Sequence, residues 1–381
     1  MYAPSMSTYP ARTEPQTIFF LGATGYLGSV VLAQLAEQAP QHKVVVLLRP
    51  GGSSVSTTTS PVPGAASVQE KLNCLKLIHP NIVGVVEGSL DDKEAIAKAC
   101  EEVDLVLNCA SSDHLDSVEA TLEGLERNSA AHPGRPPIYI HVSGCGILSD
   151  NARGEFKKAE DIPEYSDIGF DLKSSVPQTN MHLPSDIPIF EAGIREKNPI
   201  RSLILFPGQI YGIATAGGQP TTLWIRIFLS MARAGGFVGT WGPGHNSMNN
   251  IHVVDVASAT TLLVLRAIAG TAPEGKDGIY FCGSMERKVP YREWTELMGN
   301  ILYEKGYIKE KGTRPLAETI VEPLGHYGWS LLGGNQFARP ERLATLGWEP
   351  VETAKQDMMA SLPLMIEQAL SEVDWVPTVQ V

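Results

Sequence analysis

Several features that define other classes of protein are scarce or missing in this chain of 381 residues. No apolar stretch reaches the roughly 20 residues needed to cross a bilayer, so no membrane partner is expected. Basic residues are in the minority, because 30 Lys and Arg stand against 42 Asp and Glu and give a net charge of -12. A surface of that sign repels phosphate backbones, which argues against a nucleic-acid partner.

Cysteine is also scarce, with five residues and no C-x-x-C pair. Most of the five lie in apolar runs, where a thiol behaves as a small hydrophobic side chain. The pattern indicates free, buried thiols in a reducing compartment, and we expect no metal site. The N-terminal residues lack the apolar segment of a secretory signal, so we expect a cytoplasmic protein with a flexible tail over residues 1–15.

The chain does have the composition of a folded α/β protein, with 43% hydrophobic and 19% charged residues. Short, nearly continuous apolar runs predict parallel strands that are covered on both faces. Helical stretches between several of them predict a doubly wound Rossmann sheet of about seven strands with a smaller cap. The predicted strands are Thr17–Leu21, Lys43–Leu48, Ile82–Val86, Leu105–Asn108, Ile138–Val142, Ser202–Phe206 and Ile279–Cys282.

Two kinds of segment interrupt the alternation of strands and helices. A polar loop rich in Pro and Ser is expected at Pro50–Pro63. Residues 144–184 form a long connection, and a connection of that length is usually a functional lid or disordered. We assign residues 16–211 and 251–283 to the Rossmann domain, and residues 212–250 and 284–381 to a substrate-binding cap.

A glycine-rich turn, Gly22-Ala-Thr-Gly25-Tyr-Leu-Gly28, follows the first predicted strand and opens a helix. Glycines in that place permit a tight turn and let the backbone approach a pyrophosphate, while the helix N-terminus supplies free N–H groups. The turn therefore predicts a dinucleotide site. The alternative is a plain glycine-rich turn between strand and helix.

The end of the second strand bears on which nucleotide binds. Arg49 stands there, and no acidic residue occurs between Lys43 and Ser67, so NADP(H) is favoured over NAD(H). The alternative for Arg49 is a solvated surface arginine. Ser53 and Ser54 offer additional hydroxyl donors to a 2′-phosphate.

These segments together resemble an extended or atypical short-chain dehydrogenase/reductase, of the fungal epimerase/dehydratase-like or NmrA-like type. The resemblance covers most of residues 17–350 and is carried by GATGYLG, GSLDD, NCAS, VSG, FPGQIYG, NNIHVVDVASA and NQFARPERLATLGWEP. It implies a cofactor site, in which Asp91 is either an acceptor for the adenine amino group or a helix N-cap. The implied cofactor-binding residues are Gly22, Thr24, Gly25, Tyr26, Leu27, Gly28, Arg49, Leu90, Asp91, Ala110, Ser111, Pro207 and Ile210.

The chain departs from this group at its catalytic pair, Tyr-x-x-x-Lys. The group's catalytic Ser matches Ser143, but no Tyr-x-x-x-Lys follows it at the expected place, and we interpret Tyr307…Lys311 near the C-terminus as coincidence. His182 and Asp186 fall close to the Tyr and Lys positions. Because prolines occur at positions 184 and 188, we expect a regular helix only from about Ile189.

Four residues are therefore candidates for the catalytic centre. His182 is the candidate acid or base, and Ser143 the candidate donor to a substrate oxygen. Asp186 is expected to accept from ribose hydroxyls or to orient His182, and His114 is a second candidate for the pocket. Each has a structural alternative: Ser143 as a strand-end serine, His182 as a surface or loop histidine, Asp186 as a helix N-cap, and His114 as a solvated residue at a helix start.

Three classes of function remain open. The first is an NADP(H)-dependent reductase or dehydrogenase for a carbonyl, imine or activated alkene. The second is a non-redox isomerase, dehydratase or cyclase, and the third is a nucleotide-binding sensor without turnover. Fungal relatives with this resemblance often act in secondary metabolism, which implies a small-molecule substrate, and a homodimer remains possible. Cap aromatics either line an apolar pocket or pack the cap's own core: Tyr211, Trp224, Phe228, Phe237, Trp241 and Trp294.

Overall fold

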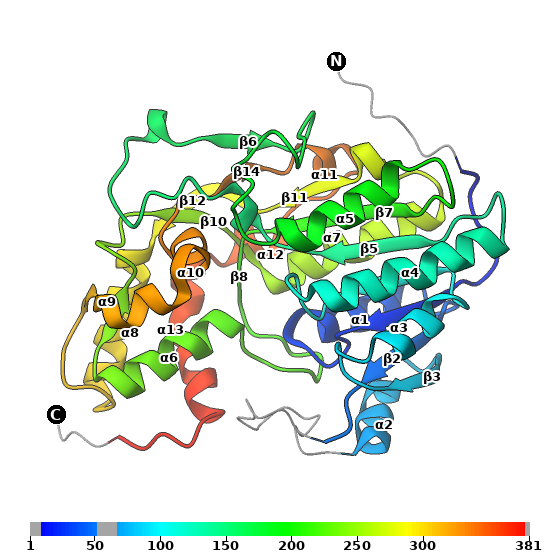
Figure 1. Ribbon diagram of the computed structural model, residues 1–381. Coiled ribbons are helices and arrows are strands. Elements are labelled where there is room, and N and C mark those ends of the chain that lie inside the picture. Colours follow the sequence, from blue (N-terminus) through cyan, green and yellow to red (C-terminus); the bar gives the residue numbers. More distant parts are fainter. Residues whose placement is uncertain (1–8, 52–66, 378–381) are drawn as a thin grey trace.

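Seven parallel strands form the centre of the molecule, in the order β11-β7-β5-β4-β1-β2-β3 (Figure 1). The computed structural model describes residues 9–51 and 67–377. All seven predicted strands are present, so the predicted doubly wound sheet is confirmed. The strands are β1 (Thr17–Leu21), β2 (Lys43–Leu48), β3 (Ile82–Glu87), β4 (Leu105–Asn108), β5 (Ile138–Val142), β7 (Arg201–Pro207) and β11 (Ile279–Cys282).

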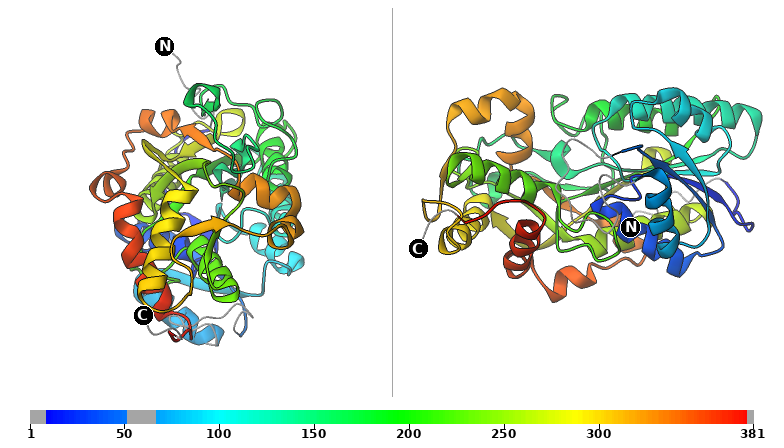
Figure 2. Two further views of the ribbon diagram at one scale, coloured as in Figure 1. Left: turned by 90° about the vertical axis from the view of Figure 1, so that its left-hand side faces the viewer. Right: turned by 90° about the horizontal axis from the view of Figure 1, so that it is seen from below.

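Helices bury both faces of this sheet, as the two views of Figure 2 show. Successive side chains of a strand point to opposite faces, so Ile18 and Phe20 of β1 pack in one apolar core and Phe19 and Leu21 in the other. The first core is closed by α1 (Tyr26–Gln38), α2 (Val68–Ile78) and α7 (Val253–Ile268), and the second by α3 (Lys93–Cys100), α4 (Leu115–Ala131) and α5 (Leu183–Ile194). Every helix in the described ranges is too short or too polar to cross a bilayer.

The cap stands beyond the carboxyl ends of the strands and has a third apolar core (Figure 1). Its aromatic rings pack that core, and Tyr211, Phe228, Trp241 and Trp294 are at most 1% exposed. Of the two alternatives for these rings, a pocket lining and the cap's own core, the structure shows the core for these four. The cap comprises β8 (Gln209–Tyr211), α6 (Leu223–Gly235), β9 (Val238–Thr240), β10 (Ser247–His252), β12 (Ser284–Pro290), α8 (Tyr291–Glu304), β13 (Thr313–Pro315), α9 (Glu318–Val321), α10 (Gly325–Leu332) and α13 (Met358–Ser371).

The long connection between β5 and α5 is paired with the C-terminal part of the chain. Its short strand β6 (Glu164–Ser166) runs parallel to β14 (Phe337–Arg339). The helices α11 (Glu341–Thr345) and α12 (Val351–Lys355) follow β14, and Leu343 packs in a core of the central sheet. This differs from the expected boundary, because part of the presumed cap returns to the Rossmann part of the molecule.

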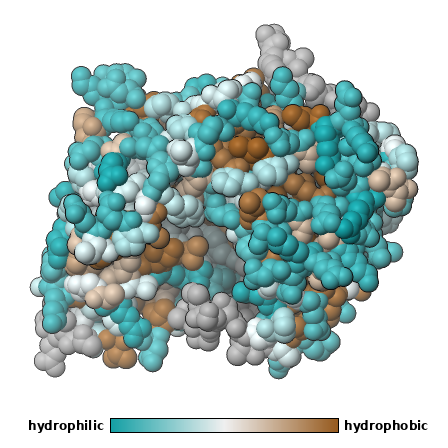
Figure 3. Space-filling model, viewed as in Figure 1, coloured by the Kyte–Doolittle hydropathy of each residue, from teal (hydrophilic) through white to brown (hydrophobic). Residues whose placement is uncertain are grey.

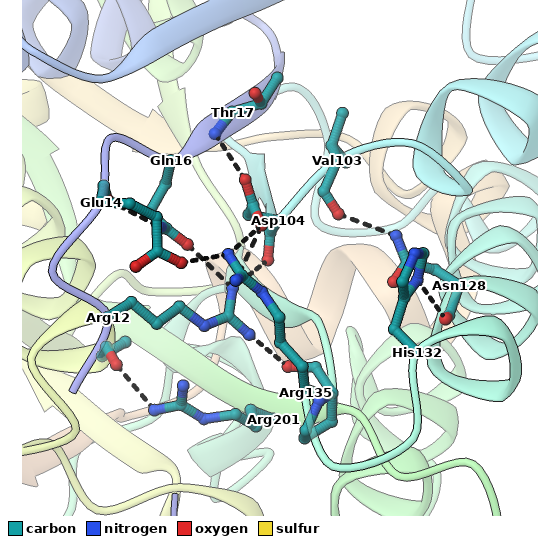
Figure 4. Close-up of polar contacts among 12 residues, drawn as sticks. Arg12, Glu14, Gln16, Thr17, Val103, Asp104, Asn128, His132, Arg135 and Arg201 are labelled. Carbon is teal, nitrogen blue, oxygen red and sulfur yellow. Dashed lines mark hydrogen bonds and ion pairs between the residues drawn. The ribbon is translucent and has the colours of Figure 1, made fainter. Parts of the chain in front are cut away.

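The N-terminal segment is anchored at the opposite, amino-terminal edge of the sheet (Figure 4). The backbone N–H of Arg12 donates to Ile268 O at 2.9 Å, and its guanidinium donates to Pro136 O at 2.5 Å. Asp104 accepts from the backbone of Thr17 at 2.8 Å and from Arg135 at 2.9 Å. The segment around Arg12 thus makes specific contacts where a flexible tail was expected.

Candidate active site

The glycine turn between β1 and α1 has a geometry that only glycine satisfies. Gly22 has φ of 91°, and a Cβ there would lie 2.6 Å from the backbone N of Ala110. A Cβ on Gly28 would lie 2.0 Å from Gly22 O. The helix that follows has Gly25 as its N-cap, no side-chain cap and no acidic residue in its first turn. Its first N–H groups therefore suit an anionic pyrophosphate, and these residues fit a dinucleotide.

Two cations meet at the end of β2. Arg49 is exposed, and the ammonium of Lys71 on α2 donates to the carbonyl oxygens of Arg49 at 2.9 Å and Gly51 at 2.8 Å. Burial lowers the pKa of Lys71, and the charge of Arg49 lowers it further. An anion bound beside them would relieve that repulsion. Ser53 and Ser54, the additional donors expected for this site, lie outside the described residues.

The cofactor candidates after β3 and β4 form the rim of the site. The carboxylate of Asp91 is exposed and lies 3.1 Å from His114 Nε2, while His114 Nδ1 accepts from the backbone N–H of Ser117 at 3.1 Å. His114 is therefore the N-cap of α4, with both ring nitrogens engaged there. The N-cap of α3 is Asp92, one residue after Asp91, and Leu90 packs partly buried against the sheet core.

Two hydrogen bonds tie the glycine turn to the segment that leads into the cap. The Tyr26 hydroxyl donates to Gly212 O at 2.8 Å, and the backbone N–H of Gln219 donates to Thr24 O at 3.2 Å. Leu27 packs in the sheet core. The remaining cofactor candidates lie at the carboxyl ends of strands: Ala110 and Ser111 after β4, Pro207 at the end of β7, and Ile210 in β8.

Helix α5 begins at Leu183, so the expectation that it becomes regular only near Ile189 is wrong. Pro184 is tolerated because the first turn of a helix does not need its N–H. The helix also continues through Pro188. Asp186 consequently lies in the first turn, four residues after His182, on the same side of the helix.

His182 is the N-cap residue of α5, in the left-handed conformation with φ of 67°. It is 7% exposed, and its Nδ1 lies 2.7 Å from Asp113 Oδ1. Its other ring nitrogen, Nε2, lies beside the backbone that follows Ser143, where a Cβ on Gly144 would be 2.9 Å away and one on Gly146 3.0 Å away. The two glycines thus make room for the imidazole. Burial alone would raise the pKa of Asp113, but the hydrogen bond and charge of His182 outweigh it, so this pKa is lowered.

Ser143 and Asp186 form a second hydrogen-bonded pair, in addition to that of His182 and Asp113. Ser143 Oγ donates to Asp186 Oδ2 at 2.8 Å, and the carboxyl group of Asp186 is fully buried. Burial, with a further contribution from the charge of Asp113, raises the pKa of Asp186 well above its ordinary value, although the bond from Ser143 opposes this. Asp186 is accordingly a carboxyl group that favours its neutral form.

A buried histidine of the sheet lies near the second pair. Burial lowers the pKa of His141 to about 3, so its imidazole is neutral. Its Nδ1 lies 3.1 Å from Asn108 Nδ2, a donor, so Nδ1 accepts and the ring proton is on Nε2. That Nε2 lies 3.7 Å from Asp186 Oδ1. That separation is too long for a hydrogen bond, so His141 bonds to Asn108 and only lies near the Ser143–Asp186 pair.

The structure brings His182, Ser143 and Asp186 together and places His114 at the rim. Sequence reasoning missed Asp113, His141, Lys71 and Tyr327, whose hydroxyl donates to Asp113. A signal existed for two of them, since Asp113 lies in the loop that follows β4 and His141 interrupts an apolar strand. Tyr307 and Lys311 are remote from this site, where Tyr307 packs on Trp375 and Lys311 pairs with Glu304.

Comparison with known proteins agrees with the architecture. Residues 14–121 match the NmrA-like family. The oxidase ucsJ of an Acremonium species is 25% identical over an alignment of 355 residues that covers 88% of this chain and 92% of that protein. An uncharacterized protein of Saccharomyces cerevisiae, YLL056C, is 23% identical over 75% of this chain and 80% of its own length.

Solved structures of other proteins share the fold of this chain. The UDP-glucose 4-epimerase of Bifidobacterium longum, in complex with NAD⁺ and UDP, superposes with a TM-score of 0.59 at 15% identity, covering 93% of this chain and 99% of that one. The dTDP-glucose 4,6-dehydratase of Bacillus anthracis, in complex with NAD, has a TM-score of 0.58 at 15% identity, with 94% and 98% covered. The resemblance inferred from sequence is confirmed to this extent: residues 14–121 match the NmrA-like family, and the chain shares its fold with these epimerase and dehydratase structures.

Proposed function

We propose that this protein is an NADP(H)-dependent oxidoreductase of atypical short-chain dehydrogenase/reductase type. It acts on a carbonyl, imine or activated alkene of a small, largely apolar substrate. The observation that carries the proposal is the His182–Asp113 pair, whose free Nε2 lies beside Gly144, at the strand edge where such folds bind ligands. The NAD complexes of similarly folded enzymes support a nicotinamide cofactor.

The cofactor would be held by groups that follow β1 and β2 and by a lysine on α2. The glycine turn and the start of α1 would hold the pyrophosphate, and Arg49, fixed by Lys71, would hold the 2′-phosphate. The nicotinamide, when bound, supplies hydride chemistry. NADP(H) rather than NAD(H) is proposed because the end of β2 carries two cations and no carboxylate.

The protein's own groups then handle the proton and the orientation of the substrate. His182 delivers or removes the proton through Nε2, while Asp113 on Nδ1 fixes the ring. Ser143 is the candidate donor to the substrate oxygen, and it would exchange its present bond to Asp186 for a bond to that oxygen. An imidazole does this without an ammonium neighbour, because its ordinary pKa is already near neutrality; this explains how the site works without Tyr and Lys.

The apolar character of the substrate is inferred from the hollow between the cap and the Rossmann part, which Figure 3 shows with apolar side chains on its wall between α6 and α10. Leu223 and Ile227 on α6 are 58% and 41% exposed, and Leu324 before α10 is 49% exposed. Exposed apolar groups clustered at a concave surface are typical of ligand sites.

A non-redox isomerase or dehydratase is the second candidate. The observation that favours it is the same His182–Asp113 pair, because an acid–base pair transfers protons without net hydride transfer. Solved neighbours with this fold also include epimerases and dehydratases. A sensor that binds the nucleotide without turnover is a third, and it predicts cofactor binding with no product.

The test is turnover and NADP(H) binding measured in parallel on three variants, with phenanthrenequinone as the first apolar carbonyl probe. His182→Ala is expected to lower turnover by about 10²–10⁴-fold and leave NADP(H) affinity nearly unchanged. Ser143→Ala should lower turnover to a smaller extent, and His114→Ala serves as the control at the rim. Wild-type turnover in His182→Ala would move the acid–base role elsewhere. A product formed without net oxidation of NADPH would favour the isomerase.

A further inference from the structure

A tyrosine of the cap reaches the catalytic pair from the other side of the hollow. Tyr327 lies on α10, and its hydroxyl donates to Asp113 Oδ2 at 3.3 Å. The other oxygen of the same carboxylate, Oδ1, is 2.7 Å from His182 Nδ1. Tyr327 is 45% exposed.

The helix that carries Tyr327 is held firmly. Trp329 Nε1 donates to Glu322 at 3.1 Å, and the guanidinium of Arg153 lies 3.8 Å from the Trp329 ring centroid. Asn246 Nδ2 donates to Leu332 O at 3.1 Å. Arg153 belongs to the long connection that ends at His182, so α10 and that connection are packed against each other. Tyr327 is therefore presented to Asp113 by fixed structure.

Tyr327 and Ser112 both donate a hydrogen bond to the carboxylate of Asp113. Burial and the neighbouring Asp113 raise the pKa of Tyr327 to about 12, so the phenol keeps its proton and only donates. Its bond, like that of Ser112 at 2.9 Å, favours the charged carboxylate. Tyr327 and Ser112 both donate to Oδ2, while Oδ1 contacts His182.

We propose that Tyr327 is a positioning residue through which the cap fixes the Asp113–His182 pair for proton transfer, so that the pair is in its working geometry only with the cap in place. The proposal rests on the proposed function of His182. It identifies a phenol from the cap in a site that lacks the phenol its class normally carries on the helix after β5.

The first test needs no substrate. We would follow the carboxyl carbons of ¹³C-aspartate-labelled protein by NMR against pH, with Asp113→Asn identifying the signal. Tyr327→Phe should raise the midpoint of Asp113 by roughly half a pH unit, because a bond to its charged form is lost. Tyr307→Phe, a cap tyrosine that packs on Trp375, is the matched control and should leave it unchanged. The groups facing Asp113 are His182, His141, Asp186 and Tyr327, so the first three must stay intact.

The second test separates positioning from simple packing. With phenanthrenequinone and NADPH, Tyr327→Phe should lower kcat roughly tenfold with little change in the KM for NADPH. In an Asp113→Asn background the same change should have no further effect, since the path through the carboxylate is gone. Additive losses, or an unshifted Asp113 midpoint in folded Tyr327→Phe, would overturn the proposal. An upward shift of the midpoint with no turnover in any variant would instead reject the proposed activity and leave the coupling in place.

Discussion

Asp186 is a fully buried carboxyl group, and burial makes its charged form unfavourable. It is fully buried, it accepts from Ser143, and its second oxygen faces the neutral His141 at 3.7 Å. Taking an ionised carboxylate out of water is expensive, so the neutral acid is favoured. The site therefore combines a charged carboxylate, Asp113, and a neutral one, Asp186, within a few side chains of each other.

The raised pKa of Asp186 predicts how the free energy of unfolding changes with pH. Because the pKa of Asp186 is raised in the folded state, the folded protein binds more protons than the unfolded chain above the ordinary Asp pKa. The contribution of Asp186 to stability is thus greatest at low pH and is lost as pH rises toward the raised pKa. The amide in Asp186→Asn does not titrate. As pH rises, the free energy of unfolding of the wild type should therefore fall relative to that of Asp186→Asn, by at most about 1.4 kcal/mol per pH unit.

The measurement is urea unfolding of both proteins between pH 5 and pH 8. Asp374→Asn, at a position near the end of α13 where the side chain is not buried, is the matched control and should track the wild type. Parallel curves for wild type and Asp186→Asn would show that Asp186 ionises freely in the folded protein.

The residues of the site differ in how far sequence could reveal them. Ser143 and His182 stand at fixed places after a strand and at a helix start, so local patterns and the family resemblance located them. Tyr327 is 214 positions from Asp113, and nothing local in the sequence marks that contact. Aromatic residues in the cap have the same limitation, because burial in a cap core and exposure in a pocket require the same residue types.

At the scale of elements, helix α2 fixes the end of β2 through one side chain. Lys71 spans from the helix to two carbonyl oxygens after the strand, and the turn between them includes Gly51 at φ of 75°. The strands themselves were predictable because each is a short apolar run with strong local preference. The hydrogen bond from Lys71 to the carbonyl oxygen of Arg49 was not predictable, because the two residues are 22 positions apart in the sequence.

We expect the two cations to act on NADP(H) and not on NAD(H). Arg49→Ala should weaken NADP(H) binding by about 2–3 kcal/mol, the value of a charge-assisted bond or two, and barely change NAD(H). Lys71→Met keeps the apolar stem but releases the turn, so it should produce a smaller loss in the same direction. Lys76→Met, on the same helix, is the control. Fluorescence titration with both cofactors checks this, and equal losses for NADP(H) and NAD(H) would remove Arg49 from the role.

At the scale of the whole molecule, one asparagine joins three distant segments. Asn335 precedes β14, and its side chain donates to Asp150 of the long connection at 3.0 Å and accepts from the backbone of Ser247 in β10 at 3.0 Å. It is 2% exposed. These bonds, together with the β6–β14 pairing, hold the long connection, which was expected to be a lid or disordered, against the cap and the C-terminal segment.

Asn335→Ala leaves the buried N–H of Ser247 without this acceptor, so unfolding should become easier by roughly 1–3 kcal/mol. Thermal unfolding would measure this loss of stability. Amide hydrogen exchange should become faster across residues 144–184, the long connection. Asn73→Ala, at an exposed position of α2, is the matched control and should change stability by less than about 0.5 kcal/mol. Equal effects of the two changes would contradict the joining role of Asn335.

The pairing of β6 with β14 has a consequence for the order of events during translation. β6 ends at Ser166, but its partner begins at Phe337, and Tyr327 is made only shortly before it. N-terminal parts of a chain generally fold first as they leave the ribosome, at about 5–20 residues per second. The Rossmann strands β1 to β5 therefore emerge well before the segments that secure the long connection and reach Asp113. The Asp113–His182 pair therefore gains its contact with Tyr327 only late in synthesis, well after both of its own residues have been made.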